Sequence, residues 1–410
     1  MRNGRRRRHG TGRPRPVKVN ARWLLVAVAL IALNLRPFIA GIGPLAADIG
    51  RHTGLGLKGM SLLTLVPMLL MGVFAFAGPW LQTRIGARRA VVAALVLLVL
   101  GSVLRVFTQN GWQLVGTAAL LGLGAAVVQA LLPGIVKRQF PRHVGVVMGL
   151  YSAMLMGGGA LGAQVAPLVA AASGNWHLGL AWMAVPALLA VALAAHSLPP
   201  DAPGRQDSLA VTAYLRRPRV WLLMLCFGLV NGGYSTVVAW LAPFFQEHGW
   251  SAAGSGTLLA VLALSQALAA LGLPMLAGRR EDRRPWLWFT LALQAIGFAA
   301  LALWPDAAPL AWVVLLGAGL GGCFALSLIV ALEHLSDPGQ AGALSALMQG
   351  GGFLIAAIPP WIIALLRDAT GGFRAGWLMH LACVAIVALL YGRVAPASYP
   401  GAIRLVPRAT

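Results

Sequence analysis

Apolar runs long enough to cross a membrane follow one another along almost the whole chain, separated by short polar loops. A helix needs roughly 20 apolar residues to cross a hydrocarbon core about 30 Å thick. Backbone groups must be paired inside lipid, so these runs predict an all-α membrane protein. We expect twelve spans, at residues 22–46, 58–82, 90–108, 112–134, 144–171, 177–197, 219–245, 252–277, 285–304, 309–332, 342–366 and 373–393.

The composition excludes an ordinary soluble domain. Hydrophobic residues make up 59% of the 410 residues and charged residues only 10%, which is typical of membrane proteins. The net charge of +22 lies mostly in loops between apolar runs, so we expect the lipid bilayer, and not nucleic acid, as the partner. Cys226, Cys323 and Cys383 lie in apolar runs without a ligand pattern, so we expect no metal and no cofactor.

The loops predict five segments and their topology. The segments are a disordered basic cytoplasmic tail (1–21), a six-helix bundle (22–197), a cytoplasmic linker (198–218), a second six-helix bundle (219–393) and a cytoplasmic tail (394–410). Nearly all of the 32 lysines and arginines then lie inside the cell, whereas Arg51, Lys58, Arg367 and Arg374 lie outside. This bias predicts an inner-membrane protein with both termini in the cytoplasm.

The two halves of the chain also share sequence. Residues 151–159 (YSAMLMGGG) match residues 344–352 (LSALMQGGG), and residues 121–124 match residues 316–319 one span earlier. An even number of spans in each repeat makes the halves parallel, which is typical of alternating-access carriers. We therefore expect twelve transmembrane helices in two parallel six-helix halves.

Arg36 interrupts the first apolar run deep inside the predicted span. It lies roughly 20 Å along a helix from Arg22, where a charge costs about 3 kcal/mol or more unless it faces a wet cavity or a partner. Pro37 removes a backbone donor and leaves the carbonyl of Leu33 unpaired. We interpret Asn34 and Arg36 as part of a solute site at the membrane midplane. The alternative is an arginine held by a salt bridge inside a helix bundle.

These motifs together resemble the major facilitator superfamily and, within it, the cyanate/nitroimidazole transporter family. The residues that carry the resemblance are 34–37 (NLRP), 132–141 (LPGIVKRQFP), 149–152 (GLYS), 239–243 (AWLAP), 344–350 (LSALMQG) and 368–371 (DATG). The resemblance covers residues 22–393 and implies the major facilitator fold, with spans one, four, seven and ten around a central cavity. It also implies transport of small, often anionic or planar solutes, and it leaves the individual substrate open.

Two positions depart from the family pattern. The loop after the second span keeps Arg84, Gly86 and Arg88, but Thr83 stands where the superfamily usually has an acid. The usual charge lock between the halves is therefore not expected at this loop. Gln129 stands where the family usually has asparagine, which keeps the hydrogen-bonding capacity and changes the reach.

The candidates for solute binding beside Arg36 and Asn34 are polar or aromatic residues far from the span ends. They are Gln129, Tyr151, Asn231, Tyr234, Trp240 and Gln349. A guanidinium offers a planar fork that matches a carboxylate-like anion. Each amide must bond either another helix or the solute. The aromatic side chains either stack on the solute or pack between helices.

No acidic residue lies in the middle of a predicted span, so we expect the solute itself to be the counter-ion of Arg36. If a proton is the coupling ion, it travels on the solute or uses His380, which otherwise packs against a neighbouring helix. Arg105 lies near the outer end of the third span, where it can extend to the interface, and receives no binding role.

Two glycine triplets have a mechanical interpretation. They are Gly157, Gly158 and Gly159, and Gly350, Gly351 and Gly352. Glycines let helix backbones approach closely and weaken the helix locally. They therefore predict either gating helices that bend and slide or tight static packing.

We therefore expect a transporter and not an enzyme. It moves a small anionic or planar organic solute by rocker-switch alternating access, as a monomer. A multidrug-type exporter would need an acid in the cavity, and an enzyme would need a group of acids or histidines on a sizeable loop. A receptor would need a signalling domain, and the tails are too short and polar to fold into one.

Overall fold

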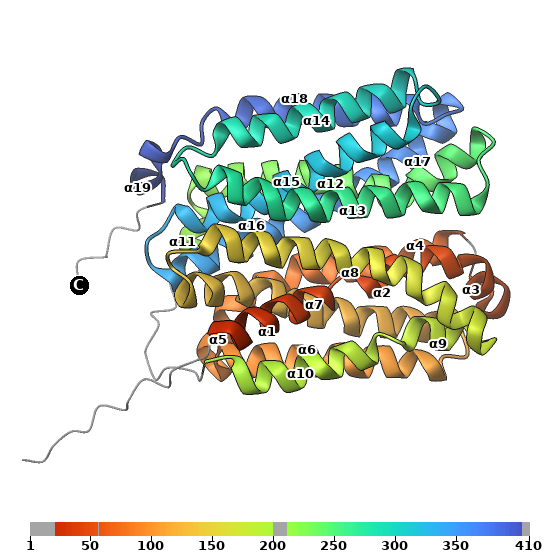
Figure 1. Ribbon diagram of the computed structural model, residues 1–410, viewed down its shortest axis with the longest axis horizontal. Helices are drawn as coiled ribbons and strands as arrows, with labels where there is room; N and C mark the ends of the chain where they lie inside the picture. Colours follow the sequence, from red (N-terminus) through yellow and green to blue (C-terminus); the bar gives the residue numbers. More distant parts are fainter. Residues whose placement is uncertain (1–20, 56, 200–210, 404–410) are drawn as a thin grey trace, which may run out of the picture.

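The computed structural model describes residues 21–55, 57–199 and 211–403, and every regular element in these ranges is helical. The helices form two bundles that lie side by side, one from the first half of the chain and one from the second (Figure 1). The predicted tail before residue 21, most of the predicted linker and residues 404–410 lie outside the described residues.

The first bundle contains two spans that are interrupted. Its elements are α1 (Ala21–Leu33), α2 (Pro37–Ala40), η1 (Gly43–Leu45), α3 (Ala46–Thr53), α4 (Leu57–Ala75), α5 (Gly78–Ile85), α6 (Ala87–Leu104), η2 (Arg105–Phe107), α7 (Gly111–Gln139), α8 (Val144–Ser173), α9 (Trp176–Ala181) and α10 (Ala184–Ser197). The helices α1 and α2 divide the first span, and α9 and α10 divide the sixth.

The second bundle contains one divided span. Short helices precede the first span of this bundle and follow its last one. Its elements are α11 (Val211–Leu215), α12 (Pro218–Glu247), α13 (Ala252–Ala277), α14 (Arg284–Leu303), α15 (Pro309–Glu333), α16 (Pro338–Ala356), α17 (Pro359–Thr370), α18 (Arg374–Tyr391), η3 (Pro396–Ser398) and α19 (Tyr399–Ala402). In the described ranges 11 helical segments are long and apolar enough to cross a membrane, and α4 adds a shorter apolar stretch at Leu62–Ala75. The predicted all-α membrane fold is therefore confirmed.

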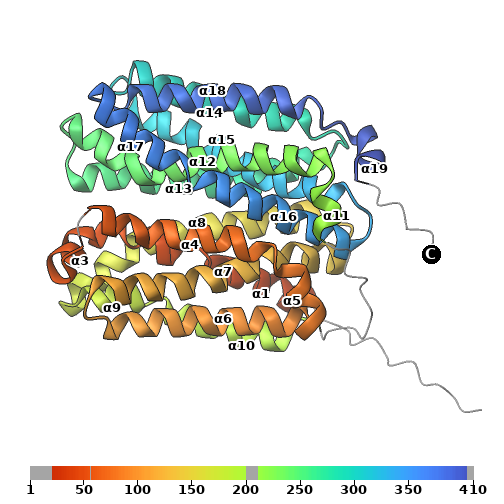
Figure 2. The same cartoon turned by 180° about the vertical axis from the view of Figure 1, so that it is seen from behind.

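The two bundles repeat the same helix pairings. In the first bundle α7 packs against α4 and α6, α8 packs against α1, and α6 packs against α10. In the second bundle α15 packs against α13 and α14, α16 packs against α12, and α14 packs against α18. The view from behind shows these layers with α4 and α16 at the junction of the bundles (Figure 2). The sequence repeat thus corresponds to a repeat in the packing.

The first span breaks where Pro37 follows Arg36. Helix α1 ends at Leu33 and α2 begins at Pro37, because proline cannot donate a hydrogen bond and disfavours helical geometry in the residue before it. Helix α8 packs tightly against this break. A Cβ atom on Gly158 would lie 2.0 Å from the carbonyl oxygen of Leu33, and one on Gly162 would lie 2.5 Å from Cα of Pro37. Glycine is required at both positions by this close approach.

The glycine triplets do not break their helices, because α8 and α16 run through residues 157–159 and 350–352. A Cβ atom on Gly350 would lie 2.9 Å from the carbonyl oxygen of Gly72 in α4, and one on Gly352 would lie 2.4 Å from the ring of Phe227 in α12. Gly158 and the triplet at 350–352 therefore provide close helix packing, whereas Gly157 has no atom within 4 Å of a Cβ; the role of the triplets in gating stays a prediction.

The segment after α18 folds back onto the second bundle. The guanidinium of Arg219 donates hydrogen bonds to the Arg393 carbonyl oxygen (2.8 Å) and to Oγ of Ser398 (2.9 Å). The Tyr399 ring stacks on His334 with the ring centroids 3.9 Å apart. The predicted tail at 394–410 therefore starts with a docked segment and not with a free one.

Replacing Gly158 with alanine is expected to lower the free energy of unfolding by about 1–3 kcal/mol, since the new methyl group would overlap the Leu33 carbonyl. The matched control is Gly157→Ala, because no atom lies within 4 Å of a Cβ at that position. Thermal unfolding in detergent measures the stability of both variants. Equal melting temperatures for the two variants would contradict this packing of the break.

Docking of the segment around Tyr399 is expected to weaken as the pH falls. Burial, with the positive charges of Arg219 and Lys137, lowers the pKa of His334 from 6.5 to about 4. The stacked Tyr399 ring adds to this burial, so the undocked histidine has the higher pKa and docking loses stability as the pH falls from 6.5 toward 4.

Hydrogen exchange of the peptide that contains Tyr399, corrected for intrinsic exchange, measures this docking at pH 7 and pH 5. The variant His334→Gln carries no titrating group at this position and should remove the pH dependence. Unchanged protection of the native protein at pH 5 would show that His334 does not control the segment.

Candidate solute-binding site

The side chain of Arg36 lies at the junction of the two bundles and is only 3% exposed. Its Cζ atom lies 5.2 Å from the ring centroid of Tyr234 in α12 and 5.7 Å from that of Phe353 in α16. Both distances are within the range of a cation–π contact. The first bundle therefore supplies the charge, and the second bundle supplies the two aromatic rings around it.

Among the described residues Arg36 has no acidic partner. Its Nε and Nη2 atoms are buried and have no hydrogen-bond partner within the described part of the chain. The ion pairs found there join other arginines to acids at helix ends and in loops: Arg51 with Asp48, Arg283 with Glu333, Arg284 with Asp282, and Arg367 with Glu247 and Asp368. The alternative of a salt-bridged Arg36 is therefore not what the described residues show.

The two rings can offset the cost of burying the charge. A charge within a membrane costs about 3 kcal/mol or more, and a desolvated cation–π contact contributes about 2 kcal/mol. Together, two such contacts contribute a free energy of about the same size as this cost. The rings are not hydrogen-bond acceptors of the carboxylate kind, and the buried Nε and Nη2 atoms have no hydrogen-bond partner in the described part of the chain, so they remain available to an anion.

Helix α8 forms a further wall beside Arg36. A Cβ atom on Gly159 would lie 3.6 Å from Cβ of Arg36. Tyr151 lies two turns earlier, on the same face as Gly158, and is close enough to interact electrostatically with Arg36. Its hydroxyl group is buried and has no hydrogen-bond partner in the described structure. Arg36 and Tyr151 thus supply unpaired donors to the same region.

Two glutamines face each other across the bundles. Nε2 of Gln349 in α16 donates to the backbone carbonyl oxygen of Gln129 in α7, at 3.2 Å, and to that of Ser345 at 3.4 Å. Nε2 of Gln129 lies 4.0 Å from the sulfur atom of Met71. The Oε1 atoms of both glutamines are buried without a partner among the described residues, so each remains a free acceptor between the bundles.

The side chains of three candidate residues donate hydrogen bonds to backbone carbonyl oxygens. None of the contacts described for these residues involves Arg36. Nδ2 of Asn34 donates to the carbonyl oxygens of Leu30 (2.7 Å) and Pro186 (3.3 Å), which ties the break to α10. Nδ2 of Asn231 donates to the Phe227 carbonyl oxygen at 2.8 Å. Nε1 of Trp240 donates to the Pro360 carbonyl oxygen at 2.8 Å. Their geometry is that of helix supports, and solute binding by them stays a prediction.

The expectation that Arg105 extends to the membrane interface is wrong. This side chain is only 1% exposed, and Nη1 and Nη2 each donate to the carbonyl oxygen of Phe38 at 3.2 Å. Helix α2 has a single turn, and the amide of Ile42 donates to Ile39 instead of Phe38. The Phe38 carbonyl is therefore left open at a helix end, and Arg105 fills the place of the missing amide.

His380 packs inside the second bundle. Its Nε2 atom lies 2.9 Å from Oγ1 of Thr236, and its ring stacks on Phe298 with the centroids 5.1 Å apart. The histidine is 1% exposed. These contacts fit the packing alternative and do not link His380 to Arg36.

The bundles also meet at the end that carries the loops with Arg88, Arg142 and Arg280, which we call the basic end. There, Nζ of Lys137 in α7 donates to the carbonyl oxygens of Leu332 and Leu335 at the end of α15. Nearby, α7 and α16 touch directly, since a Cβ atom on Gly342 would lie 2.8 Å from Cα of Gly134. A cation on helix-terminal carbonyls joins the bundles here.

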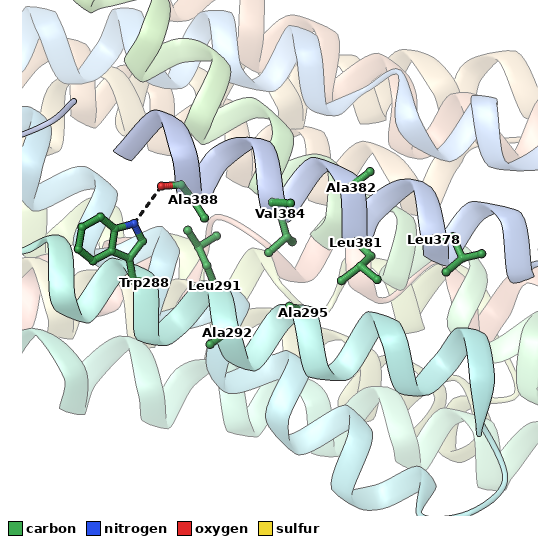
Figure 3. A pocket seen from close by; sticks show the side chains of 10 residues that line it. Trp288, Leu291, Ala292, Ala295, Leu378, Leu381, Ala382, Val384 and Ala388 are labelled. Atoms are coloured by element: carbon green, nitrogen blue, oxygen red, sulfur yellow. Dashed lines mark hydrogen bonds between the residues drawn. The ribbon is translucent and has the colours of Figure 1, made fainter. Parts of the chain in front are cut away.

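An apolar groove lies on the outer side of the second bundle between α14 and α18 (Figure 3). It has a volume of about 470 Å³ and is lined by alanine, leucine and valine side chains with Trp288 at one end. Nε1 of Trp288 donates to the Ala388 carbonyl oxygen at 2.9 Å. The groove offers no charged group to an anion, so it does not compete with Arg36 as the candidate site.

Comparison with known proteins agrees with this architecture. The sequence model of the Major Facilitator Superfamily matches residues 23–360, so the chain belongs to this family of membrane transporters. The protein is therefore a multi-pass membrane transporter for small-molecule solutes, and not an enzyme.

Among relatives, the cyanate transport protein CynX of Escherichia coli (strain K12) is 39% identical over 92% of this chain and 98% of its own length. The 2-nitroimidazole transporter of the same organism is 31% identical over 90% of this chain and 93% of its own length. The resemblance found in the motifs is thus confirmed.

Solved structures show the same fold. The human organic anion transporter MFSD10 has a TM-score of 0.70, with 16% identity over 90% of this chain and 99% of that one. The proton:xylose symporter XylE has a TM-score of 0.74, with 16% identity over 90% of this chain and 95% of that one.

Replacing Gly134 with leucine is expected to force the bundles apart at the basic end, because the side chain would enter the contact with Gly342. Gly116→Leu on the same helix is the control, since no atom lies within 4 Å of a Cβ there. Spin labels at positions 142 and 280 report the separation by double electron–electron resonance. The distance should increase in Gly134→Leu alone, and an unchanged distance would contradict the contact.

Proposed function

We propose that this protein is a secondary transporter that moves a small, planar anionic solute of the cyanate- or nitroimidazole-like class across the inner membrane. The observation that carries the proposal is the buried guanidinium of Arg36, which has no carboxylate partner within the described structure. The rings of Tyr234 and Phe353 reduce the cost of the buried charge but leave Nε and Nη2 without a hydrogen-bond acceptor, and the planar fork of arginine matches a planar anion. The solute then supplies the missing negative charge.

The relatives support this class of solute. The two Escherichia coli transporters have names that refer to cyanate, a small linear anion, and to 2-nitroimidazole, a small planar ring compound. A multidrug-type exporter for cations would place an acid where this chain has Arg36. Around Arg36 we propose Tyr151, Tyr234, Gln129 and Gln349 as solute contacts, with Asn34, Asn231 and Trp240 in support.

We propose rocker-switch alternating access with the two bundles, residues 22–197 and 219–393, as the moving units of a monomer. Arg36 lies where the bundles meet, so a rocking motion would open it first to one side and then to the other. The packed triplets at residues 157–159 and 350–352 are the proposed sliding surfaces. By the positive-inside rule the basic end and both termini face the cytoplasm.

A coupled proton would travel on the solute in this scheme. His380 is bonded to Thr236 inside the second bundle and faces no group of the site that the structure describes. We therefore do not propose it as a proton carrier. An anion that binds its proton on one side and releases it on the other requires no titrating side chain in the cavity.

A thermal-shift screen of small anions, including cyanate, formate and nitrate, tests the proposal on purified protein. The best anion is expected to raise the melting temperature of the native protein and to have no such effect on Arg36→Ala. Arg36→Lys keeps the charge without the fork, so it should bind roughly tenfold or more weakly. Gly116→Ala is the control with full binding, since no atom lies within 4 Å of a Cβ there and the residue has no proposed role. Equal stabilisation of the native protein and Arg36→Ala would refute the role of Arg36.

A further inference from the structure

An alternating-access carrier moves its site from one side of the membrane to the other, and we call each such change a crossing. Net transport needs one crossing with solute bound and one without solute. Exchange uses only crossings with solute bound. In the loaded crossing the anion balances the charge of Arg36. In the other crossing the protein alone must stabilise that charge inside a medium in which an unbalanced charge is costly. This step is a problem particular to a site built on a buried cation.

The groups that the chain supplies to Arg36 are aromatic rings. Tyr234 and Phe353 lie 5.2 Å and 5.7 Å from Cζ of Arg36 and belong to the second bundle. Ring faces carry partial negative charge and attract a cation, yet they are neutral as a whole. They therefore stabilise the guanidinium without competing with an anion as a full charge would.

The geometry also separates the two kinds of partner. A ring attracts the cation through its π face without accepting a conventional hydrogen bond, whereas an anion binds the N–H groups of the guanidinium. The buried Nε and Nη2 atoms have no hydrogen-bond partner in the described structure. The same arginine can therefore keep its rings while it binds and releases an anion.

Other groups of the described structure do not fill this role. Glu247 and Glu333 pair with Arg367 and Arg283 far along the helices, at their ends. The free amide oxygens of Gln129 and Gln349 have no described contact with the guanidinium. The two rings remain as the groups in contact with the charge.

We propose that Tyr234 and Phe353 are positioning residues that hold Arg36 during the crossing without solute, and that they thereby permit net transport in addition to exchange. This inference rests on the proposed function, because it requires that an anion binds Arg36. It assigns a role to Phe353, and it changes the role of Tyr234 from solute contact to a contact of Arg36.

The test compares two assays on the purified carrier in proteoliposomes, with labelled cyanate, formate and nitrate in turn. Net uptake is measured with the membrane potential clamped by valinomycin and potassium, and exchange is measured with the same anion on both sides. In Phe353→Leu, net uptake is expected to fall roughly tenfold while exchange stays within about twofold of the native rate.

Ring-retaining variants keep the test independent of folding. Phe353→Tyr and Tyr234→Phe preserve the ring faces and should retain net uptake. Phe298→Leu removes a buried ring that stacks on His380, and it should affect net uptake and exchange equally or not at all.

A parallel loss of both activities in Phe353→Leu, or loss of net uptake in the ring-retaining variants, would overturn the inference. So would unchanged net uptake in Phe353→Leu. If the native protein exchanges none of the three anions, or if Arg36→Ala exchanges them as well as the native protein, the proposed function itself fails.

Discussion

The positive charge of Arg36, buried where the two bundles meet, is the constraint on which the surrounding structure depends. Pro37 ends the helix beside it, and α8 can follow this break only because Gly158 and Gly162 have no side chain. Arg105 occupies the Phe38 carbonyl that the short helix α2 leaves open. A break in a membrane helix exposes backbone groups that must find partners, and neighbouring helices supply these partners here.

The same charge also connects the two bundles. The first bundle carries Arg36, and the second carries the rings of Tyr234 and Phe353 that contact it. At the basic end, Lys137 of the first bundle bonds the last carbonyls of α15 in the second. The loop with Thr83 lacks the usual acid, and this cation on helix-terminal carbonyls provides a different connection at that end.

The sequence predicted the fold correctly but only part of the residues that surround Arg36. Span lengths, the paired motifs and the position of Arg36 next to Pro37 were sufficient to predict an all-helical carrier with a break in its first span. The prediction for Arg105 was wrong, since nothing in its own span reveals an open carbonyl on another helix. Phe353 was missed, because an aromatic residue after a glycine triplet looks like ordinary packing.

The sequence by itself determined that the chain is built of membrane-spanning helices, that the first span breaks at Pro37 and that no acid lies in the middle of a span. Only the tertiary structure decided which side chains surround Arg36. Lipid and helix interfaces are both apolar, so hydrophobic periodicity does not mark the inward face of a membrane helix. Residues 36, 234 and 353 meet through helix packing, and no local pattern in the sequence records that meeting.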